Sequence, residues 1–284
     1  MPLTDPEKRA LRQTARRVRD RIIDVVFESG SGHVGAALSQ ADILVALYFR
    51  ALNLHPTDPL WPDRDRFVLS KGHGGLGLVA VLAERGLLPA QDLRRFGETG
   101  YRLGMHMDWT KVPGVEVSTG SLGHGLGVSV GMALGARLQG LPWWTFCLLS
   151  DGELYEGSTW EAAISAAGFG LDRLVAIVDR NRLTMDGFTE VQMPLEPIEA
   201  RWAAFGWRTL RVDGHDLDAL CDALDQVREA AGPAVIIADT TKGRGVDFME
   251  DEAKWHYGAL DTAMAARARA SIAATVADLE GGNV

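Results

Sequence analysis

Apolar and polar residues follow two different periods along this chain, and the period changes at short polar breaks. Short apolar runs predict five strands, at residues 66–70, 145–149, 174–178, 209–212 and 233–239. Helical spacing of apolar residues predicts helices at residues 5–28, 76–85, 158–169, 197–205, 217–231 and 262–279. Because strands and helices alternate, we expect an α/β fold with a doubly wound, mostly parallel sheet and helices on both faces.

The connections between these elements are short and rich in glycine. Ser39 is expected to cap a helix that runs to about residue 52. A glycine-rich loop at residues 118–125 is expected to open a helix that ends near residue 138, and a helix N-terminus of this kind favours anions. No linker or internal repeat is evident, so residues 1–284 are expected to form a single domain.

Oxygen-bearing side chains follow two of the predicted strands. Asp151 and Gly152 come directly after one apolar run, and Asn181 follows the next. In a parallel sheet the carboxyl ends of the strands share one edge, where ligands bind, so Asp151 and Asn181 are expected to converge. Their oxygens suit Mg2+ or Ca2+ rather than zinc. Gly152 has no Cβ and would let the backbone approach a phosphate closely.

Composition narrows the class of protein. Apolar residues make up 46% of the chain and charged residues 24%, values typical of a globular protein. The formal net charge of −9 argues against nucleic acid as a partner. The N-terminus lacks the apolar segment of a secretory signal, and no run is long enough to span a bilayer. With Cys147 and Cys221 in apolar stretches, we expect a cytoplasmic protein with reduced, buried thiols.

Five of the seven histidines lie in loops that interrupt the helix and strand patterns: His33, His73, His106, His124 and His256. Imidazole can donate, accept and shuttle protons near neutral pH, although a single loop histidine is usually only solvated. His215 is expected to be a turn residue.

The positions of these loops resemble a known family. The segment SDGELYEG at 150–157, followed by Asn181, resembles the thiamine diphosphate motif. SGH at 31–33, SKGHG at 70–74, the loop with His106, STGSLGHG at 118–125 and WHYGA at 255–259 resemble successive transketolase motifs in the family's order. The resemblance covers about residues 10 to 260 and matches the family's amino-terminal, diphosphate-binding half.

The resemblance implies a set of cofactor and metal contacts. A divalent metal, Mg2+ with Ca2+ as the alternative, would be held by the side chains of Asp151 and Asn181 and by the carbonyl of Leu183. His73 and His256 match contacts to the diphosphate of thiamine diphosphate, and Asp151 and Asn181 also belong to that cofactor site. The remaining matches to cofactor contacts are Gly152, at the diphosphate, and Gly120 and Leu122, around the thiazolium and pyrimidine rings.

The resemblance also implies catalytic roles. His33 and His106 match histidines that face a donor sugar, and His256 is counted with them. Glu156 matches a glutamate that communicates between paired active sites near a subunit interface. Two positions depart from the family pattern: Ser150 stands where the motif usually begins with glycine, and His124 stands where many members have glutamine.

The chain stops before the second, pyrimidine-binding domain that the family needs to complete its site. The resemblance therefore implies a split transketolase, active in carbohydrate metabolism, in which this subunit pairs with a separate pyrimidine-binding subunit, as a heterotetramer. That enzyme would transfer a two-carbon ketol unit from a ketose, or ketose phosphate, to an aldose. The chain alone is expected to be inactive.

Three other readings stay open at the level of sequence. The chain could be a subunit of another thiamine diphosphate enzyme, of the 2-oxo acid dehydrogenase or deoxyxylulose phosphate synthase type. It could be a cofactor-binding protein without catalysis. A dinucleotide-binding dehydrogenase is disfavoured, because no G-x-G-x-x-G follows a strand with an acidic residue at the required distance.

Overall fold

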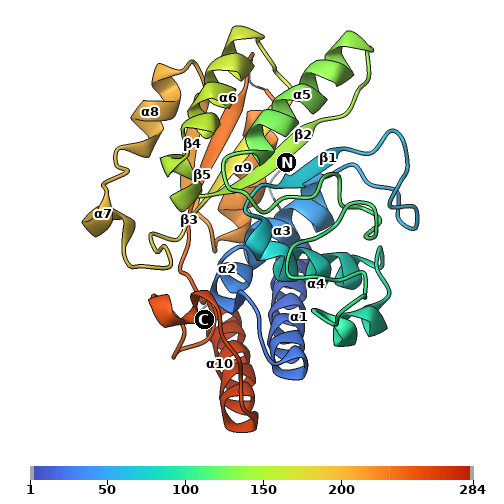
Figure 1. Cartoon of the computed structure of the whole chain (residues 1–284), viewed down its shortest axis with the longest axis vertical. Helices are drawn as coiled ribbons and strands as arrows, with labels where there is room; N and C mark the ends of the chain where they lie inside the picture. The colour runs from blue at the N-terminus through green and yellow to red at the C-terminus, as the bar shows by residue number, and fades with distance from the viewer. Residues whose placement is uncertain (1–2, 230, 282–284) are drawn as a thin grey trace.

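The computed structural model describes residues 3–229 and 231–281, and a five-stranded sheet lies at its centre (Figure 1). The strands are β1 (Arg66–Leu69), β2 (Thr145–Ser150), β3 (Leu174–Arg180), β4 (Arg208–Asp213) and β5 (Ala234–Asp239). Their order is β1-β2-β3-β5-β4, and every neighbouring pair is parallel. The α/β class and the parallel sheet expected from the sequence are confirmed.

Side chains of alternate strand residues face opposite sides of the sheet and enter two separate cores. Phe146 and Leu148 of β2 belong to one core, whereas Cys147 and Leu149 belong to the other. Strand β3 divides in the same way, and all seven of its residues are buried. This double burial explains why the central strands read as continuous apolar runs rather than alternating ones.

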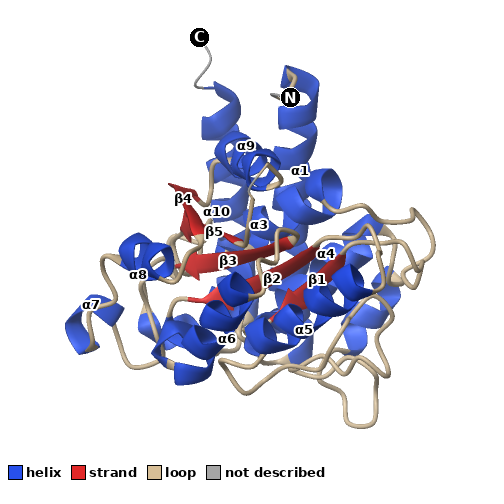
Figure 2. Ribbon diagram, turned by 90° about the horizontal axis from the view of Figure 1, so that it is seen from above, coloured by secondary structure: helices blue, strands red, loops and turns tan. Residues whose placement is uncertain are grey.

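Helices cover both faces of the sheet (Figure 2). The larger core is formed with α1 (Asp5–Ser29), α2 (Val34–Ser39), α3 (Ala41–Ala46), α4 (Gly75–Arg85), α9 (Leu217–Val227) and α10 (Thr262–Gly281). The smaller core is formed with α5 (Gly125–Leu138), α6 (Gly157–Gly168) and α8 (Ile198–Ala204). The short elements are α7 (Thr189–Gln192), a π-turn (Leu47–Ala51) and 3-10 turns at Gly72–Gly74, Ala90–Arg95, Gly152–Tyr155 and Ala253–His256.

The segment around Ser39 differs from the sequence prediction. Ser39 does not cap a helix that continues to residue 52. It is the last residue of α2, and Gln40 separates α2 from α3. The Ser39 hydroxyl instead donates to Asp179 Oδ2 at 2.6 Å. A hydrogen bond to an ionised carboxylate is stronger than one to a neutral acceptor, so Asp179 is a favourable partner for this hydroxyl.

The carboxyl ends of β1, β2, β3 and β5 meet at one edge of the sheet, as their parallel pairing requires. The segments that follow these strands carry most of the residues singled out in the sequence. Among the described residues, no helix combines the length and apolar character that a membrane span requires.

Candidate active site

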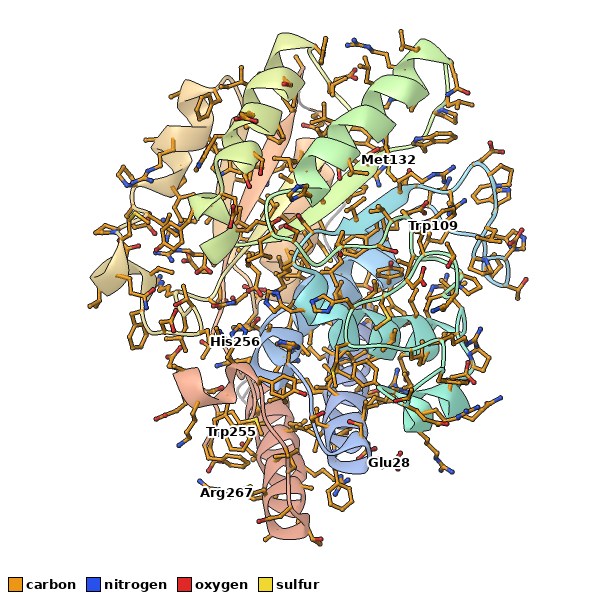
Figure 3. All side chains as sticks on the ribbon, viewed as in Figure 1. Glu28, Trp109, Met132, Trp255, His256 and Arg267 are labelled. Carbon is orange, nitrogen blue, oxygen red and sulfur yellow. The ribbon has the colours of Figure 1, made fainter. Side chains whose placement is uncertain are left out.

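Four histidines from distant parts of the chain gather into one cluster. The ring of His33 lies 5.5 Å from that of His73, 5.4 Å from that of His256 and 6.2 Å from that of His106. His73 and His256 stack with 5.4 Å between their centroids. Tyr257, which the sequence did not single out, lies 4.9 Å from His33. His256 lies beside α2 in Figure 3. We call these four histidines the histidine cluster.

Burial keeps His33, His73 and His256 of the histidine cluster uncharged. It lowers the pKa of His33 and of His256 to about 4, and the nearby charges of Lys242 and neighbouring imidazoles act in the same direction. The pKa of His73 is also lowered well below its ordinary value, by burial and then by Lys71. His33 Nδ1 is buried and has no hydrogen-bond partner among the described residues. A neutral ring with a free nitrogen is ready to bond to a ligand.

The ends of β2 and β3 lie against each other. Asp151 Oδ2 accepts from the backbone nitrogen of Arg182 at 2.6 Å and from Arg180 Nη1 at 3.1 Å, while Oδ1 accepts from the backbone nitrogen of Gly152 at 2.8 Å. Arg182 has a φ of 63°, which is uncommon for a residue other than glycine. The chain therefore turns sharply just after Asn181, and its backbone reaches Asp151.

Oxygen atoms with spare acceptor capacity gather around this turn. Asn181 Oδ1 accepts one hydrogen bond, from the backbone nitrogen of Leu183 at 3.1 Å, and an amide oxygen can accept two. The Leu183 carbonyl receives the ammonium of Lys242 at 2.7 Å, so this oxygen already attracts a cation. With one carboxylate, one amide and one backbone carbonyl, the donors fit a hard cation such as Mg2+.

Among the described residues, histidine, cysteine, aspartate and glutamate do not form a metal site by themselves. In the part of the chain that the structure describes, no group of three or more of these side chains is arranged to hold a metal ion. The candidate site at Asp151 is not such a group, because two of its three donors are an amide and a backbone carbonyl. It is therefore a site that depends on further ligands, such as phosphate oxygens and water.

Lys242 connects the candidate metal ligands to the histidine cluster. The sequence analysis did not identify this residue. Its Nζ contacts the Leu183 carbonyl at 2.7 Å, the Thr184 carbonyl at 3.1 Å and His256 Nδ1 at 2.9 Å. Burial lowers its pKa to about 8, with Asp151 acting in the opposite direction. The signal for Lys242 in the sequence was only its place in the TTKG segment after β5, which the parallel sheet puts at the same edge.

A second buried network lies behind the site. Asp179 Oδ2 accepts from Ser39 and from Lys71 Nζ, and Oδ1 accepts from the Thr240 hydroxyl. Asn181 Nδ2 also approaches Asp179 Oδ2, at 3.4 Å. Because the amide nitrogen of Asn181 faces this carboxylate, the amide oxygen faces the opposite way. The network thus orients a candidate metal ligand.

A buried glutamate joins three loops of the same edge. Glu153 Oε1 accepts from the Ser70 hydroxyl and from the backbone nitrogen of Gly123 at 2.7 Å, while Oε2 accepts from the backbone nitrogen of Ser150 at 3.3 Å. Burial raises the pKa of Glu153, although these hydrogen bonds oppose the change. Leu122 directly precedes the tethered Gly123. The glycine-rich loop is therefore fixed to the end of β2.

The remaining predicted residues lie at the margin of the site. A Cβ on Gly120 would lie 3.3 Å from the His106 ring, so this glycine leaves room beside the histidine cluster. Glu156 is exposed at the N-cap of α6, and a Cβ on Gly123 would lie 2.6 Å from the Glu156 Cβ. Among the described contacts, Glu156 makes none with the histidine cluster.

His124 and His215 have different environments. His124 is exposed, and its Nδ1 lies 3.2 Å from the Leu122 carbonyl. His215 is in a turn, as expected, but its ring has a further role. Nδ1 lies 2.8 Å from Asp42 Oδ2, and Nε2 accepts from the backbone nitrogen of Thr241 at 2.8 Å. It therefore fixes the residue next to Lys242.

Comparison with known proteins agrees with this geometry. The family model of the transketolase thiamine diphosphate binding domain matches residues 11–276. The chain is 42% identical over 247 residues to the 6-deoxy-6-sulfo-D-fructose transketolase subunit SqwG of Clostridium sp. (strain MSTE9), covering 87% of this chain and 90% of that one. It is 42% identical over 248 residues to an apulose-4-phosphate transketolase subunit of Actinobacillus succinogenes, again covering 87% and 90%.

A solved structure indicates the same family, but the match covers a smaller share of the solved chain. Transketolase from Campylobacter jejuni superposes with a TM-score of 0.87 and 31% identity, over 93% of this chain. The same match covers only 42% of the Campylobacter chain. The chain thus spans most of the relatives whose names call them subunits and less than half of this solved transketolase. The chain belongs to the transketolase family, as a subunit with its thiamine diphosphate-binding domain.

Proposed function

We propose that this chain is the diphosphate- and metal-binding subunit of a split transketolase, in which one thiamine diphosphate-binding domain spans the chain. The observation that carries the proposal is the position of Lys242. One ammonium group contacts both the Leu183 carbonyl, a candidate metal ligand, and His256, a member of the histidine cluster. An anionic group bound to the Lys242 ammonium would therefore lie close to both the candidate metal ligands and the histidine cluster.

The residues of the sheet edge divide the binding of the cofactor among them. Asp151, Asn181 and the Leu183 carbonyl hold Mg2+, with Ca2+ as the alternative. His73, His256 and Lys242 bind the diphosphate, and the backbone of Gly152 approaches it. Gly120 and Leu122 border the rings. Bound thiamine diphosphate supplies the carbanion chemistry of ketol transfer, and the protein supplies position and electrostatics.

His33 and His106 act on the donor sugar. Both rings belong to the histidine cluster, and the low pKa of His33 keeps that ring neutral, with Nδ1 free to bond a hydroxyl. A neutral imidazole can accept a proton at one nitrogen while it donates at the other. The donor is a ketose or ketose phosphate, and the acceptor is an aldose. The relatives named for a sulfonated ketose and for a ketose phosphate support an anionic donor.

A separate pyrimidine-binding subunit completes the site, and the assembly is a heterotetramer in the cytoplasm that serves carbohydrate metabolism. We expect the partner subunit to contact the outer faces of α5 and α6. Val128, Leu138 and Ile164 are exposed there, and a Cβ on Gly127 or Gly131 would meet no atom within 4 Å. Apolar side chains exposed on two helices that contact each other support an interaction surface there. Glu156, at the start of α6, lies beside this surface.

The experiment that tests the proposal compares the purified chain alone with the chain co-purified with the product of a neighbouring reading frame that has a pyrimidine-domain pattern. Transfer of a two-carbon unit from a ketose to an aldose is measured with thiamine diphosphate and Mg2+ in both samples. We expect transfer only in the mixture. Substantial transfer by the chain alone refutes the split site, and transfer from a 2-oxo acid in place of a ketose refutes the transketolase activity.

A variant separates the sugar contacts from the cofactor contacts. His106→Ala is expected to reduce turnover by about a hundredfold or more, the scale of a lost proton-transfer group, while cofactor affinity changes little. His124→Ala is the matched control, because His124 is also an exposed loop histidine but lies outside the histidine cluster. A loss of cofactor affinity at unchanged turnover in His106→Ala reverses the assigned role.

A further inference from the structure

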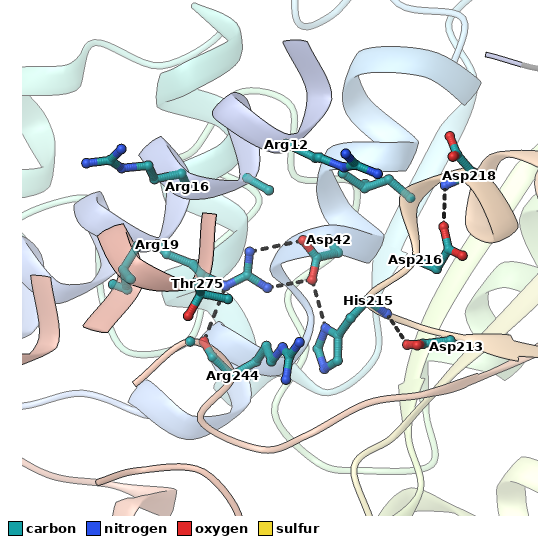
Figure 4. Close-up of a pocket in the computed structure, with 14 residues that line it drawn as sticks. Arg12, Arg16, Arg19, Asp42, Asp213, His215, Asp216, Asp218, Arg244 and Thr275 are labelled. Carbon is teal, nitrogen blue, oxygen red and sulfur yellow. Dashed lines mark hydrogen bonds and ion pairs between the residues drawn. The ribbon is translucent and has the colours of Figure 1, made fainter. Parts of the chain in front are cut away.

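Arg19, Asp42 and His215 form a buried network of polar contacts along a cavity between α1 and α9 (Figure 4). The Arg19 guanidinium donates to both oxygens of the Asp42 carboxylate, and Nδ1 of His215 lies 2.8 Å from Asp42 Oδ2. The three side chains are each at most 10% exposed. They come from α1, from α3 and from the turn before α9, and the proposed function gives none of them a role. We call these three residues the Asp42 network.

Both ends of the Asp42 network contact the backbone of one segment, residues 241–244. His215 Nε2 accepts from the backbone nitrogen of Thr241 at 2.8 Å, and Arg19 Nε donates to the backbone carbonyl of Arg244 at 3.3 Å. Lys242 lies between these two contacts in the chain. A buried ion pair is by itself weak evidence for stability, so its contacts outside the pair are the informative ones. Here those contacts hold the backbone on both sides of Lys242.

The contact with Thr241 decides which nitrogen of His215 carries the proton. A backbone nitrogen can only donate, so Nε2 of the ring has to be unprotonated to accept from it. In a neutral imidazole the proton then lies on Nδ1, where Asp42 accepts it. Burial by itself raises the pKa of Asp42, but the charge of Arg19 and the bond to His215 hold this pKa well below its ordinary value. Asp42 is therefore a carboxylate that fixes both the tautomer and the orientation of the ring.

Lys242 has a long, flexible side chain whose ammonium has to reach a defined point. Its Nζ contacts the Leu183 carbonyl at 2.7 Å and His256 Nδ1 at 2.9 Å. The stem passes close to Gly35, where a Cβ would lie 3.1 Å from Lys242 Cγ. Fixing a lysine side chain costs rotamer entropy, and a backbone that moved would no longer place the ammonium at both partners. A fixed backbone at residues 241–244 is therefore a condition for this double contact.

We propose that the Asp42 network positions the Lys242 ammonium between the candidate metal ligands and the histidine cluster. Arg19 orients the Asp42 carboxylate, and the carboxylate orients the His215 ring. The ring and Arg19 then hold the backbone on the two sides of Lys242. Among the described contacts, none joins the network to a candidate metal ligand or to the histidine cluster, so its members are positioning residues. This inference rests on the proposed function, in which Lys242 binds the diphosphate.

The test replaces His215 by phenylalanine in the full chain assembled with its partner subunit. His215→Phe keeps a ring without nitrogen, the cavity of about 310 Å³ beside it leaves room for the extra atom, and Asp42 keeps its bonds to Arg19. By calorimetry with Mg2+ present, we expect the affinity for thiamine diphosphate to fall about tenfold, while turnover at saturating cofactor changes less than about twofold. Thermal unfolding establishes that the variant is folded.

Two further variants separate positioning from a general effect on the fold. His215→Gln carries an amide oxygen and an amide nitrogen, so it can accept and donate as the neutral imidazole does. We expect its cofactor affinity to lie within about threefold of that of the unmodified assembly. His55→Phe is the matched control, because the His55 ring also accepts from backbone nitrogens, but in the loop that leads into the amino end of β1. We expect this control to leave cofactor affinity unchanged.

Amide hydrogen exchange of the chain without cofactor gives a readout that does not depend on the proposed function. We expect the Thr241 amide to exchange at least about tenfold faster in His215→Phe than in the unmodified chain, because its acceptor is lost. Unchanged exchange at Thr241, unchanged cofactor affinity in His215→Phe, or an equal loss of affinity in His55→Phe overturns the positioning role. Failure of the unmodified assembly to bind thiamine diphosphate refutes the proposed function, and with it the role of the Asp42 network in cofactor binding.

Discussion

Two buried aspartates at the ends of neighbouring strands have opposite environments. Asp179, at the end of β3, accepts from Ser39, Lys71 and Thr240, and it makes its ion pair with a lysine that is equally buried. Asp151, just after β2, accepts from two backbone nitrogens and from Arg180. Arg180 is shared, because it also pairs with two glutamates.

The pKa directions express this difference. Burial by itself raises the pKa of a carboxyl group, but the charge of Lys71 and the hydrogen bonds at Asp179 lower the pKa of that residue below its ordinary value. At Asp151 burial prevails over Arg180, and the pKa is raised. The negative charge of Asp179 is therefore stabilised by its own partners in the fold. The negative charge of Asp151 is stabilised less, and a bound cation would stabilise it further. We infer that the metal binds beside Asp151.

The largest effect is expected when the satisfied pair is broken. Asp179→Ala leaves the Lys71 ammonium buried without its partner, so the free energy of unfolding should fall by about 3–5 kcal/mol, measured by urea denaturation. The double variant Asp179→Ala with Lys71→Met removes both charges and should recover much of this loss. A single-variant loss below about 1 kcal/mol would mean that the pair is not structural.

Asp151→Ala should reduce cofactor affinity more than it reduces stability. In Asp151→Ala, Arg180 keeps Glu190 and Glu196, so the free energy of unfolding should change by less than it does in Asp179→Ala. Affinity for thiamine diphosphate in the presence of Mg2+ should fall at least tenfold, about 1.4 kcal/mol, because a metal ligand is lost. Calorimetry of the assembled enzyme measures this. Unchanged affinity counts against the metal assignment.

The buried, neutral ring of His33 extends the comparison to pH. The folded-state pKa of His33 is about 4, below the value of 6.5 for an unperturbed histidine. Between these values the unfolded chain binds more protons, so the stability from the neutral ring is complete above about pH 6.5 and is lost as the pH falls toward 4. His33→Gln should lose stability less steeply over this range in urea titrations. An unchanged slope would contradict the burial of a neutral ring.

The smallest effect on the chain itself is expected at its exposed apolar surface. Ile164→Glu should change the free energy of unfolding by about 0.5 kcal/mol or less, because Ile164 is 54% exposed. The same change should prevent co-purification with the partner subunit. Leu60→Glu is the control, since Leu60 is 63% exposed in the loop before β1. If both variants keep the partner equally well, α6 is not the contact surface.

The sequence predicted which strands and loops form the site, because these follow from the local pattern of apolar residues and from the topology of a parallel sheet. Apolar runs identified the strands, and the parallel sheet requires their carboxyl ends to share an edge, which places Asp151 near Asn181. The loop motifs placed His33, His73, His106 and His256, and the structure brings their rings together. Asp151, Asn181, His33 and His73 stood next to a glycine or at the end of an apolar run, whereas His106 and His256 each lie two positions from a glycine.

The buried charges could not be predicted in the same way. Lys71 and Asp179 are 108 positions apart, and a lysine beside glycines looks like an ordinary surface residue in the sequence. Ser39 was expected to cap a helix because its local pattern favours that role, yet Asp179 is its partner. Such pairs depend on which segments the tertiary fold brings together. Lys242 and Glu153 were missed for the same reason.

The most direct test of the account is anomalous X-ray scattering from Mn2+ that replaces Mg2+ in crystals of the chain with thiamine diphosphate and its partner subunit. The account predicts one strong manganese peak within coordination distance of the Asp151 carboxylate, Asn181 Oδ1 and the Leu183 carbonyl. A peak elsewhere, with Asp151 still bonded only to Arg180 and backbone nitrogens, would contradict it.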